Sequence, residues 1–189
     1  MAFGTEVDSI PAAVPYRRAP AERLAIWRAR LGPRSRPRVG LAWWGSPTSR
    51  PSSIPIAELD PLLRRPGIEF HVLHKEVPDD QRDWLGQHSS AIMHTDELAD
   101  FADTAALISE MDLVITIDTS VAHLAGALGR PVWIMLRRGG DWRWLRDRID
   151  SPWYPTARLF RRGAERDWAA VVDAVVRALP DALTPSRVP

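Results

Sequence analysis

The chain contains no cysteine, and this absence removes several kinds of chemistry. Without thiols it can form no disulfide, no thiolate metal site and no cysteine nucleophile. A chain of this composition fits a reducing compartment, and we expect a cytoplasmic protein.

Long apolar runs and a strong net charge are also missing. No apolar run approaches the roughly 20 residues that cross a bilayer, so we expect no membrane span. The first 15 residues carry Glu6 and Asp8 without an apolar core, unlike a signal peptide. The formal net charge is +1, and only Lys75 among 25 basic residues is a lysine. The chain has no strong positive electrostatic field that would favour binding of nucleic acid, and we predict no such partner.

Several familiar motifs are absent. The chain has neither the glycine-lysine-threonine core of a Walker loop nor a Gly-x-Ser-x-Gly elbow. His71 and His74 stand three residues apart, a spacing that points two strand side chains to opposite faces. We therefore predict no metal site.

Short apolar runs alternate with helical patterns from Val39 onward. The runs predict strands at 39–43, 69–74, 91–94, 113–117, 132–136 and 158–160. The intervening patterns predict helices at 56–63, 79–85, 103–111 and 119–128. This alternation indicates the α/β class, with a parallel sheet covered by helices on both faces.

The two ends of the chain have different patterns. Residues 1–37 are predicted to form an extended connector and a lead-in helix that stops at Gly32-Pro33. From Trp168 to Leu179 apolar residues recur at the spacing of an amphipathic helix. We therefore place one domain at 38–180 and a polar tail at 181–189.

The segment from Asp118 to His123 stands where a predicted strand ends and a helix begins. Ligands of parallel sheets bind at the carboxyl ends of strands, and a helix N-terminus suits a phosphate. Thr119 and Ser120 can donate hydroxyls to an anion, and His123 lies in the first turn. Alternatively, one hydroxyl only caps the helix and His123 is a packing residue.

Two further loops follow strands at the same predicted edge. The loop at 45–53 offers Ser46, Arg50 and Ser52 as a phosphate cradle, or is an ordinary surface loop. Lys75 and Glu76 follow the second strand, where an acid can bind ribose and a lysine a phosphate. The alternative interpretation is that Lys75 and Glu76 are a solvated charge pair.

Aromatic and charged residues alternate in two later segments, 141–144 and 151–155. Such aromatics stack on sugar or base rings, or anchor a loop on the protein surface.

The run Asp118-Thr-Ser-Val-Ala-His-Leu-Ala-Gly-Ala-Leu-Gly resembles the signature of the glycosyltransferases related to the lipopolysaccharide heptosyltransferases. The chain is most similar to the bacterial tetratricopeptide-repeat proteins that end in such a domain. The resemblance extends from Phe3-Gly-Thr to Leu159-Phe, and includes Asp141-Trp-Arg-Trp-Leu.

This resemblance implies a Rossmann-like sheet forming the C-terminal half of a GT-B fold, with residues 38–180 binding a nucleotide sugar. Asp118 would contact the donor sugar; Thr119, Ser120 and His123 would lie at the diphosphate. The loop with Ser46, Arg50 and Ser52 would be the second phosphate contact, and Glu76 would bind the ribose. Lys75 is included only as the neighbour of Glu76. The donor would be a substrate, and no further cofactor is expected.

The chain departs from the family pattern mainly in length. The N-terminal half, which supplies the acceptor site and the catalytic base in the family, is missing, so no catalytic residue is assigned. We expect a separate N-terminal half or self-association to cover the exposed face. The hypotheses are a glycosyltransferase domain, a non-catalytic nucleotide-sugar-binding module, or a GT-B-type sugar epimerase.

Overall fold

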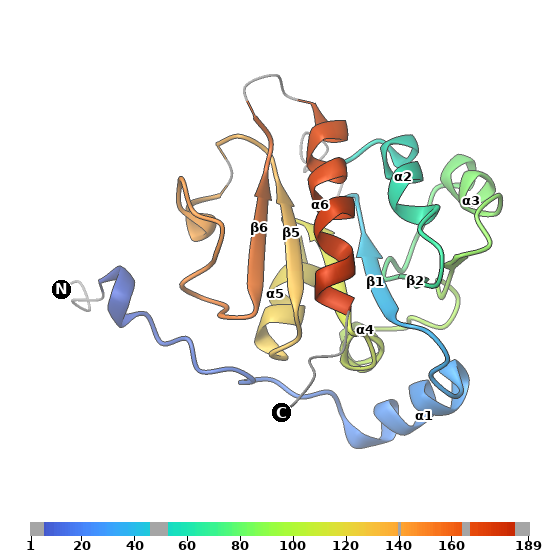
Figure 1. Cartoon of the computed structure of the whole chain (residues 1–189). Helices are drawn as coiled ribbons and strands as arrows, with labels where there is room; N and C mark the ends of the chain where they lie inside the picture. The colour runs from blue at the N-terminus through green and yellow to red at the C-terminus, as the bar shows by residue number, and fades with distance from the viewer. Residues whose placement is uncertain (1–5, 46–52, 140, 164–166, 184–189) are drawn as a thin grey trace.

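The computed structural model describes residues 6–45, 53–139, 141–163 and 167–183, and it centres on one parallel sheet (Figure 1). The strands are β1 (Arg38–Ala42), β2 (Glu69–Val72), β3 (Ala91–Ile92), β4 (Leu113–Ile117), β5 (Val132–Leu136) and β6 (Ala157–Arg161). Their order is β3-β2-β1-β4-β5-β6, and every neighbouring pair is parallel. This is the order of a doubly wound nucleotide-binding sheet, as expected for a Rossmann-like half of a GT-B fold.

One face of the sheet is covered by α4 (Phe101–Ser109) and α5 (Ser120–Ala127), which lie behind it in Figure 1. The lead-in helix α1 (Ala21–Leu31) joins the same core at the lower right of the view. The fully buried Trp27 of α1 donates its indole N–H to Asp103 Oδ1 of α4 at 3.2 Å. Asp103 Oδ2 also accepts the backbone N–H of Ala99 at 3.2 Å. The lead-in helix is therefore fixed to the domain through a nearly buried carboxylate.

The opposite face is covered by α6 (Trp168–Leu183), α2 (Asp60–Leu63) and α3 (Asp79–Leu85). A 3-10 turn, η3 (Ile56–Leu59), leads into α2. The apolar stripe of α6 packs on the sheet through its buried members Trp168, Val171, Val172, Val175 and Leu179. The strand side chains alternate between the two cores, which is why β4 and β5 are buried along their whole lengths.

Most element positions agree with the sequence prediction, and the differences lie at element ends. β1 ends at Ala42 rather than at residue 43, and β2 at Val72 rather than at 74. The helix predicted from residue 103 begins at Phe101, because Asp100 caps it. At the C-terminus α6 continues through Pro180 to Leu183, four residues beyond the predicted end at Leu179.

The connector runs along the lower side of the domain in Figure 1, after a short 3-10 turn, η1 (Val7–Ser9). The backbone N–H groups of Tyr16 and Arg17 both donate to the carbonyl of Ala127, at the end of α5 (3.0 and 3.1 Å). This contact holds the extended segment against the domain, away from the carboxyl ends of the strands.

Candidate functional site

The topology places a natural binding crevice at the carboxyl ends of β1 and β4. The chain crosses over in opposite directions from these two adjacent strands, so their following segments diverge and leave a crevice between them. The segment after β4 is Asp118-Thr119-Ser120, and the segment after β1 starts at Trp43. Two of the predicted site segments thus begin at the same point of the sheet.

The N-terminus of α5 keeps its first N–H groups free of a side-chain cap. Thr119 is the N-cap residue, but its side chain makes no capping hydrogen bond, and its Oγ1 lies 3.3 Å from Thr116 Oγ1 instead. By contrast, Asp100 caps α4 by accepting from the N–H groups of Ala102 and Asp103. The interpretation of Thr119 as a mere side-chain cap is therefore wrong. The first-turn amides of α5 point toward the crevice, as an anion site requires.

Ser120 and Asp118 complete this junction. Ser120 is exposed in the first turn of α5, and the side chain of Asp118 is 27% exposed. His123 Nε2 lies 4.0 Å from Asp118 Oδ1, so the acid and the imidazole face the same space. The four predicted residues after β4 are therefore neighbours at one strand-to-helix junction.

His123 is held on its other side by aromatic residues. Its Nδ1 lies 3.0 Å from the Tyr154 hydroxyl, and its ring stacks on Trp144 with the centroids 5.2 Å apart. Burial lowers the pKa of His123, and the nearby Asp118 carboxylate partly opposes this effect. The ring is therefore mostly neutral at pH 7, with one edge packed and the other facing Asp118.

The loop after β1 is attached at the same crevice through His74. The backbone N–H of Trp43 donates to His74 Nε2 at 3.0 Å, so this nitrogen is an acceptor and the ring is neutral. Burial lowers the pKa of His74 to about 3. Ser46, Arg50 and Ser52 lie outside the described residues. The flanks of their loop meet, because Gly45 N–H donates to Ser53 Oγ at 3.2 Å.

Lys75 and Glu76 lie at the same edge, after β2, which neighbours β1. Both are exposed, and Lys75 Nζ donates to the carbonyl of Ala99 at 2.8 Å. The two residues are therefore one strand away from the crevice, at the end where a ribose-binding acid is expected.

The aromatic residues after β5 divide into two roles. Trp144, at the end of η4 (Trp142–Trp144), is fully buried beneath His123. Trp142 is 64% exposed, with the Arg143 guanidinium 4.6 Å from its ring centre. Trp144 therefore anchors the loop, while Trp142 is largely exposed and packs edge-on against Trp153. Sequence reasoning noted this segment and Tyr154 but not their contacts with His123.

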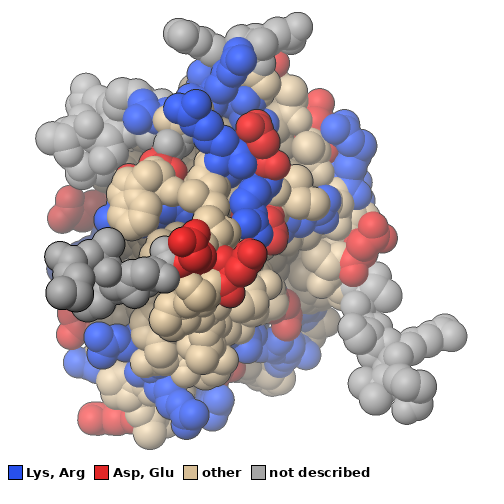
Figure 2. Space-filling view, turned by 90° about the vertical axis from the view of Figure 1, so that its left-hand side faces the viewer, with Lys and Arg blue, Asp and Glu red and all other residues tan. Residues whose placement is uncertain are grey.

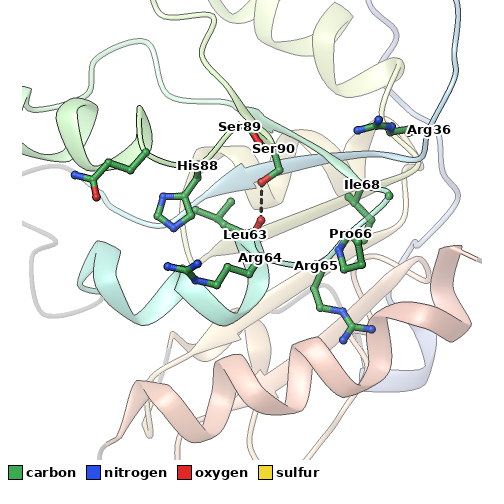
Figure 3. Close-up of a pocket in the computed structure, with 11 residues that line it drawn as sticks. Arg36, Leu63, Arg64, Arg65, Pro66, Ile68, His88, Ser89 and Ser90 are labelled. Atoms are coloured by element: carbon green, nitrogen blue, oxygen red, sulfur yellow. Dashed lines mark hydrogen bonds between the residues drawn. The ribbon is translucent and has the colours of Figure 1, made fainter.

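A cavity of about 510 Å³ lies elsewhere, around the α2–β2 turn and the residues before β3 (Figure 3). The Ser90 hydroxyl donates there to the carbonyl of Leu63, and Arg64 and His88 both pair with Asp60. Its lining residues precede β2 and β3, so it opens at the amino ends of the strands. It is therefore not the crevice predicted for the ligand.

Residues 98–135, which include α4, β4 and α5, match the model of Glycosyltransferase family 9 (heptosyltransferase). The similarity to family 9 thus lies in this stretch of the chain. The matched range includes all four candidate residues from Asp118 to His123. Family 9 is the heptosyltransferase family that the sequence resemblance indicated. The tetratricopeptide-repeat association stays a prediction.

One curated relative is Protein FlbA of Caulobacter vibrioides, which is 32% identical over 170 residues. The match covers 84% of this chain but 28% of FlbA. The chain therefore corresponds to a fraction of that relative.

Solved heptosyltransferases share the fold. ADP-heptose lps heptosyltransferase II of E. coli has a TM-score of 0.58 at 18% identity, covering 90% of this chain and 54% of the enzyme. The family 9 glycosyl transferase of Veillonella parvula has a TM-score of 0.65 at 14% identity, covering 89% of this chain and 53% of that protein. E. coli heptosyltransferase WaaC, solved with ADP, has a TM-score of 0.59 at 13% identity, covering 93% of this chain and 53% of WaaC. The chain thus spans about half the length of these proteins.

Two observations bear on metals and membranes. Within the four described ranges no group of three or more His, Cys, Asp or Glu residues is arranged to hold a metal ion. Over the same ranges no helix is both long and apolar enough to cross a membrane.

Proposed function

We propose that this chain is the nucleotide-sugar-binding domain of a glycosyltransferase. It would transfer a sugar from a nucleoside-diphosphate sugar to an acceptor hydroxyl, together with an N-terminal half. The observation that carries the proposal is the junction between β4 and α5. An acid, two hydroxyls, an imidazole and uncapped helix amides meet there, at the crevice of a doubly wound sheet.

Each residue of the junction has a distinct role in this proposal. The first-turn amides of α5 and the hydroxyls of Thr119 and Ser120 bind the diphosphate, where the helix dipole favours negative charge. Asp118 accepts hydrogen bonds from the donor sugar, and His123 Nε2 lies between the sugar and the phosphates.

The neighbouring loops supply the remaining donor contacts. Ser46, Arg50 and Ser52 approach the diphosphate from the loop after β1. Glu76 binds the ribose, with Lys75 beside it. A diphosphate leaving group needs several hydrogen-bond donors and positive charges close to its oxygens. Amides, hydroxyls and a guanidinium would supply these without a cofactor.

The remaining partners follow from the chain's span of about half of each heptosyltransferase. The catalytic base and the groups that position the acceptor hydroxyl would belong to an N-terminal half or to a second chain, which would cover the carboxyl edge of the sheet. Cytoplasmic location fits a donor made from cellular nucleotides. WaaC, a structural neighbour, was solved with ADP, which makes ADP-sugars the first donors to try.

Calorimetry with nucleoside diphosphates and their sugar conjugates tests the proposal. A screen of ADP-, UDP- and GDP-sugars identifies the donor. Asp118→Asn is expected to weaken the sugar conjugate about tenfold and to spare the free diphosphate, because the acid contacts only the sugar. Arg50→Ala is expected to weaken both by about 1.5–3 kcal/mol, through loss of a charge-assisted contact. A folded wild-type chain that binds no member of the panel overturns the proposal.

A non-catalytic binding module is the second candidate. The residues assigned above all belong to donor binding and none to acceptor activation, so they would serve a binding module equally well. Sugar transfer after adding the product of a neighbouring gene that encodes the N-terminal half would exclude this alternative.

A further inference from the structure

A second polar hollow opens at the carboxyl edge, beyond the donor crevice. It has a volume of about 520 Å³, and its lining includes Arg138, Leu145, Arg146, Asp147, Arg161 and Arg162. Four arginines and a single acidic residue thus line it. None of the residues discussed above as donor contacts lines this hollow.

The ends of two adjacent strands bring the arginines together. Arg161 is the last residue of β6 and pairs in register with Leu136, the last residue of β5. Arg162 extends this pairing by donating its N–H to the carbonyl of Leu136 at 2.8 Å. Arg138 lies two residues beyond the end of β5. Sheet pairing therefore fixes the positions of Arg161 and Arg162, and Arg138 follows the end of β5 closely.

The loop after η4 closes the hollow and is held there by Arg161. The Arg161 guanidinium donates through Nε to the carbonyl of Arg148 at 3.1 Å, and through Nη2 to that of Trp144. Leu145 and Asp147, on this loop, have φ of 53° and 56°, the positive-φ non-glycine residues in the described chain. Such backbone strain gathers at functional sites, where the surrounding structure maintains it.

The arginines are only partly satisfied by the protein. Arg162 stacks on Trp168 at 4.8 Å, while its Nε is buried without a hydrogen-bond partner among the described residues. Arg138 and Arg146 are exposed and form no ion pair within the same residues. Figure 2, which looks onto the left-hand side of Figure 1, shows a run of basic side chains in its upper centre, with acidic side chains beside and below it. The hollow thus has a local excess of positive charge, which an oxyanion would offset.

The hollow also borders the donor site. Trp144 stacks on His123, and Leu145 to Asp147 follow Trp144 directly. One loop therefore separates the donor junction from the arginines, a position suited to the second substrate rather than to the nucleotide.

We infer that this arginine hollow is a second anion-binding site, which holds a phosphate or carboxylate group of the acceptor. The planar guanidinium fork binds either oxyanion with paired hydrogen bonds. Naming the ligand as the acceptor rests on the proposed function, whereas anion binding in the hollow does not.

Calorimetric titration at low ionic strength tests the inference with two probes, inorganic phosphate and citrate. Both are titrated into the chain with and without saturating ADP. We expect binding of at least one probe with ADP present, and the preferred probe indicates whether a phosphate or a carboxylate is recognised. The double variant Arg138→Ala/Arg146→Ala should weaken that binding at least tenfold. Both side chains are exposed, so the fold should persist, and thermal melting checks this.

Arg137→Ala is the matched control, because this exposed neighbour does not line the hollow. It should leave the affinity for the probes within about twofold. Equal losses in the control and the double variant, displacement of both probes by ADP, or no binding of either probe would each overturn the inference. A chain that binds the probes but no nucleotide would refute the proposed function and leave the anion site standing.

Discussion

The Nδ1 of His123 lies 3.0 Å from the hydroxyl of Tyr154, a residue 31 positions later in the chain. This contact, with the stack on Trp144, fixes one edge of the imidazole and directs Nε2 toward Asp118. When Nδ1 accepts the tyrosine O–H, Nε2 carries the proton and is a donor facing the crevice. Tyr154 is therefore a positioning residue for His123.

Tyr154→Phe should separate this positioning from packing. The ring stays and only the hydroxyl is lost, so we expect the free energy of unfolding to fall by about 0.5–1.5 kcal/mol. Nucleoside-diphosphate affinity should fall a few-fold, and by a similar factor in His123→Ala. Urea denaturation and calorimetry measure the two effects. Unchanged affinity in a folded His123→Ala chain would mean that the imidazole is only a packing residue.

The two helix N-termini predict opposite responses to alanine. Asp100 caps α4, whereas Thr119 makes no cap bond at α5. Asp100→Ala should lower the melting temperature by a few degrees and leave nucleotide binding unchanged. Thr119→Ala should change the melting temperature little and weaken nucleoside-diphosphate binding. Thermal melting and calorimetry on both variants make the comparison. The reverse pattern would refute the assignment of Thr119 to the diphosphate.

Gly126→Ala should destabilise the domain through Tyr154. A Cβ at residue 126 would lie 2.4 Å from Cδ1 and Cγ of the Tyr154 ring, so the ring must move. We expect a loss of about 1–3 kcal/mol, as for other overpacked cores. Gly86→Ala is the control, because its Cβ would meet no atom closer than 3.4 Å. Chemical denaturation that gave equal stabilities for the two variants would contradict this account.

Stability should fall with decreasing pH because His71 and His74 stay neutral in the folded chain. Burial lowers the pKa of both His71 and His74 to about 3, from an ordinary value of 6.5. Between these values the unfolded chain takes up protons that the folded chain does not. Each histidine therefore removes about 1.4 kcal/mol per pH unit as pH falls through this window.

His74→Gln isolates one of these contributions. Glutamine keeps an acceptor for the N–H of Trp43 but does not titrate. Urea denaturation between about pH 6 and 4 should give a slope of stability against pH that is about 1.4 kcal/mol per unit shallower than in the wild type. Parallel slopes would show that His74 is protonated in the folded protein.

The sequence predicted the strands and the junction between β4 and α5 well, because both depend on local pattern. The runs at 113–117 and 132–136 are buried strands with the predicted bounds, since each is apolar throughout and is flanked by polar or turn-forming residues. The junction at Asp118 was found because a strand, a polar step and a helix follow each other directly. Helix ends were less certain, since the cap at Asp100 and the continuation through Pro180 depend on neighbouring elements.

Contacts between distant segments could not be predicted in this way. His123 meets Tyr154, and Trp43 meets His74, only because the sheet order brings the ends of separate strands together. The arginine hollow likewise requires the loop after Trp144 to fold back over the end of β6. The hydrophobic pattern of the sequence does not predict how this loop folds back.

The sheet margins restrict how this domain can assemble. At one margin β3 is two residues long, and at the other Asp150 forms an antiparallel bridge with Arg158 on β6, beside the bond from Leu159 N–H to the carbonyl of Ile149. β3 is too short to pair well with an incoming strand, and the outer edge of β6 is already paired and carries charged residues. Growth of the sheet into a continuous intermolecular ribbon is thereby disfavoured.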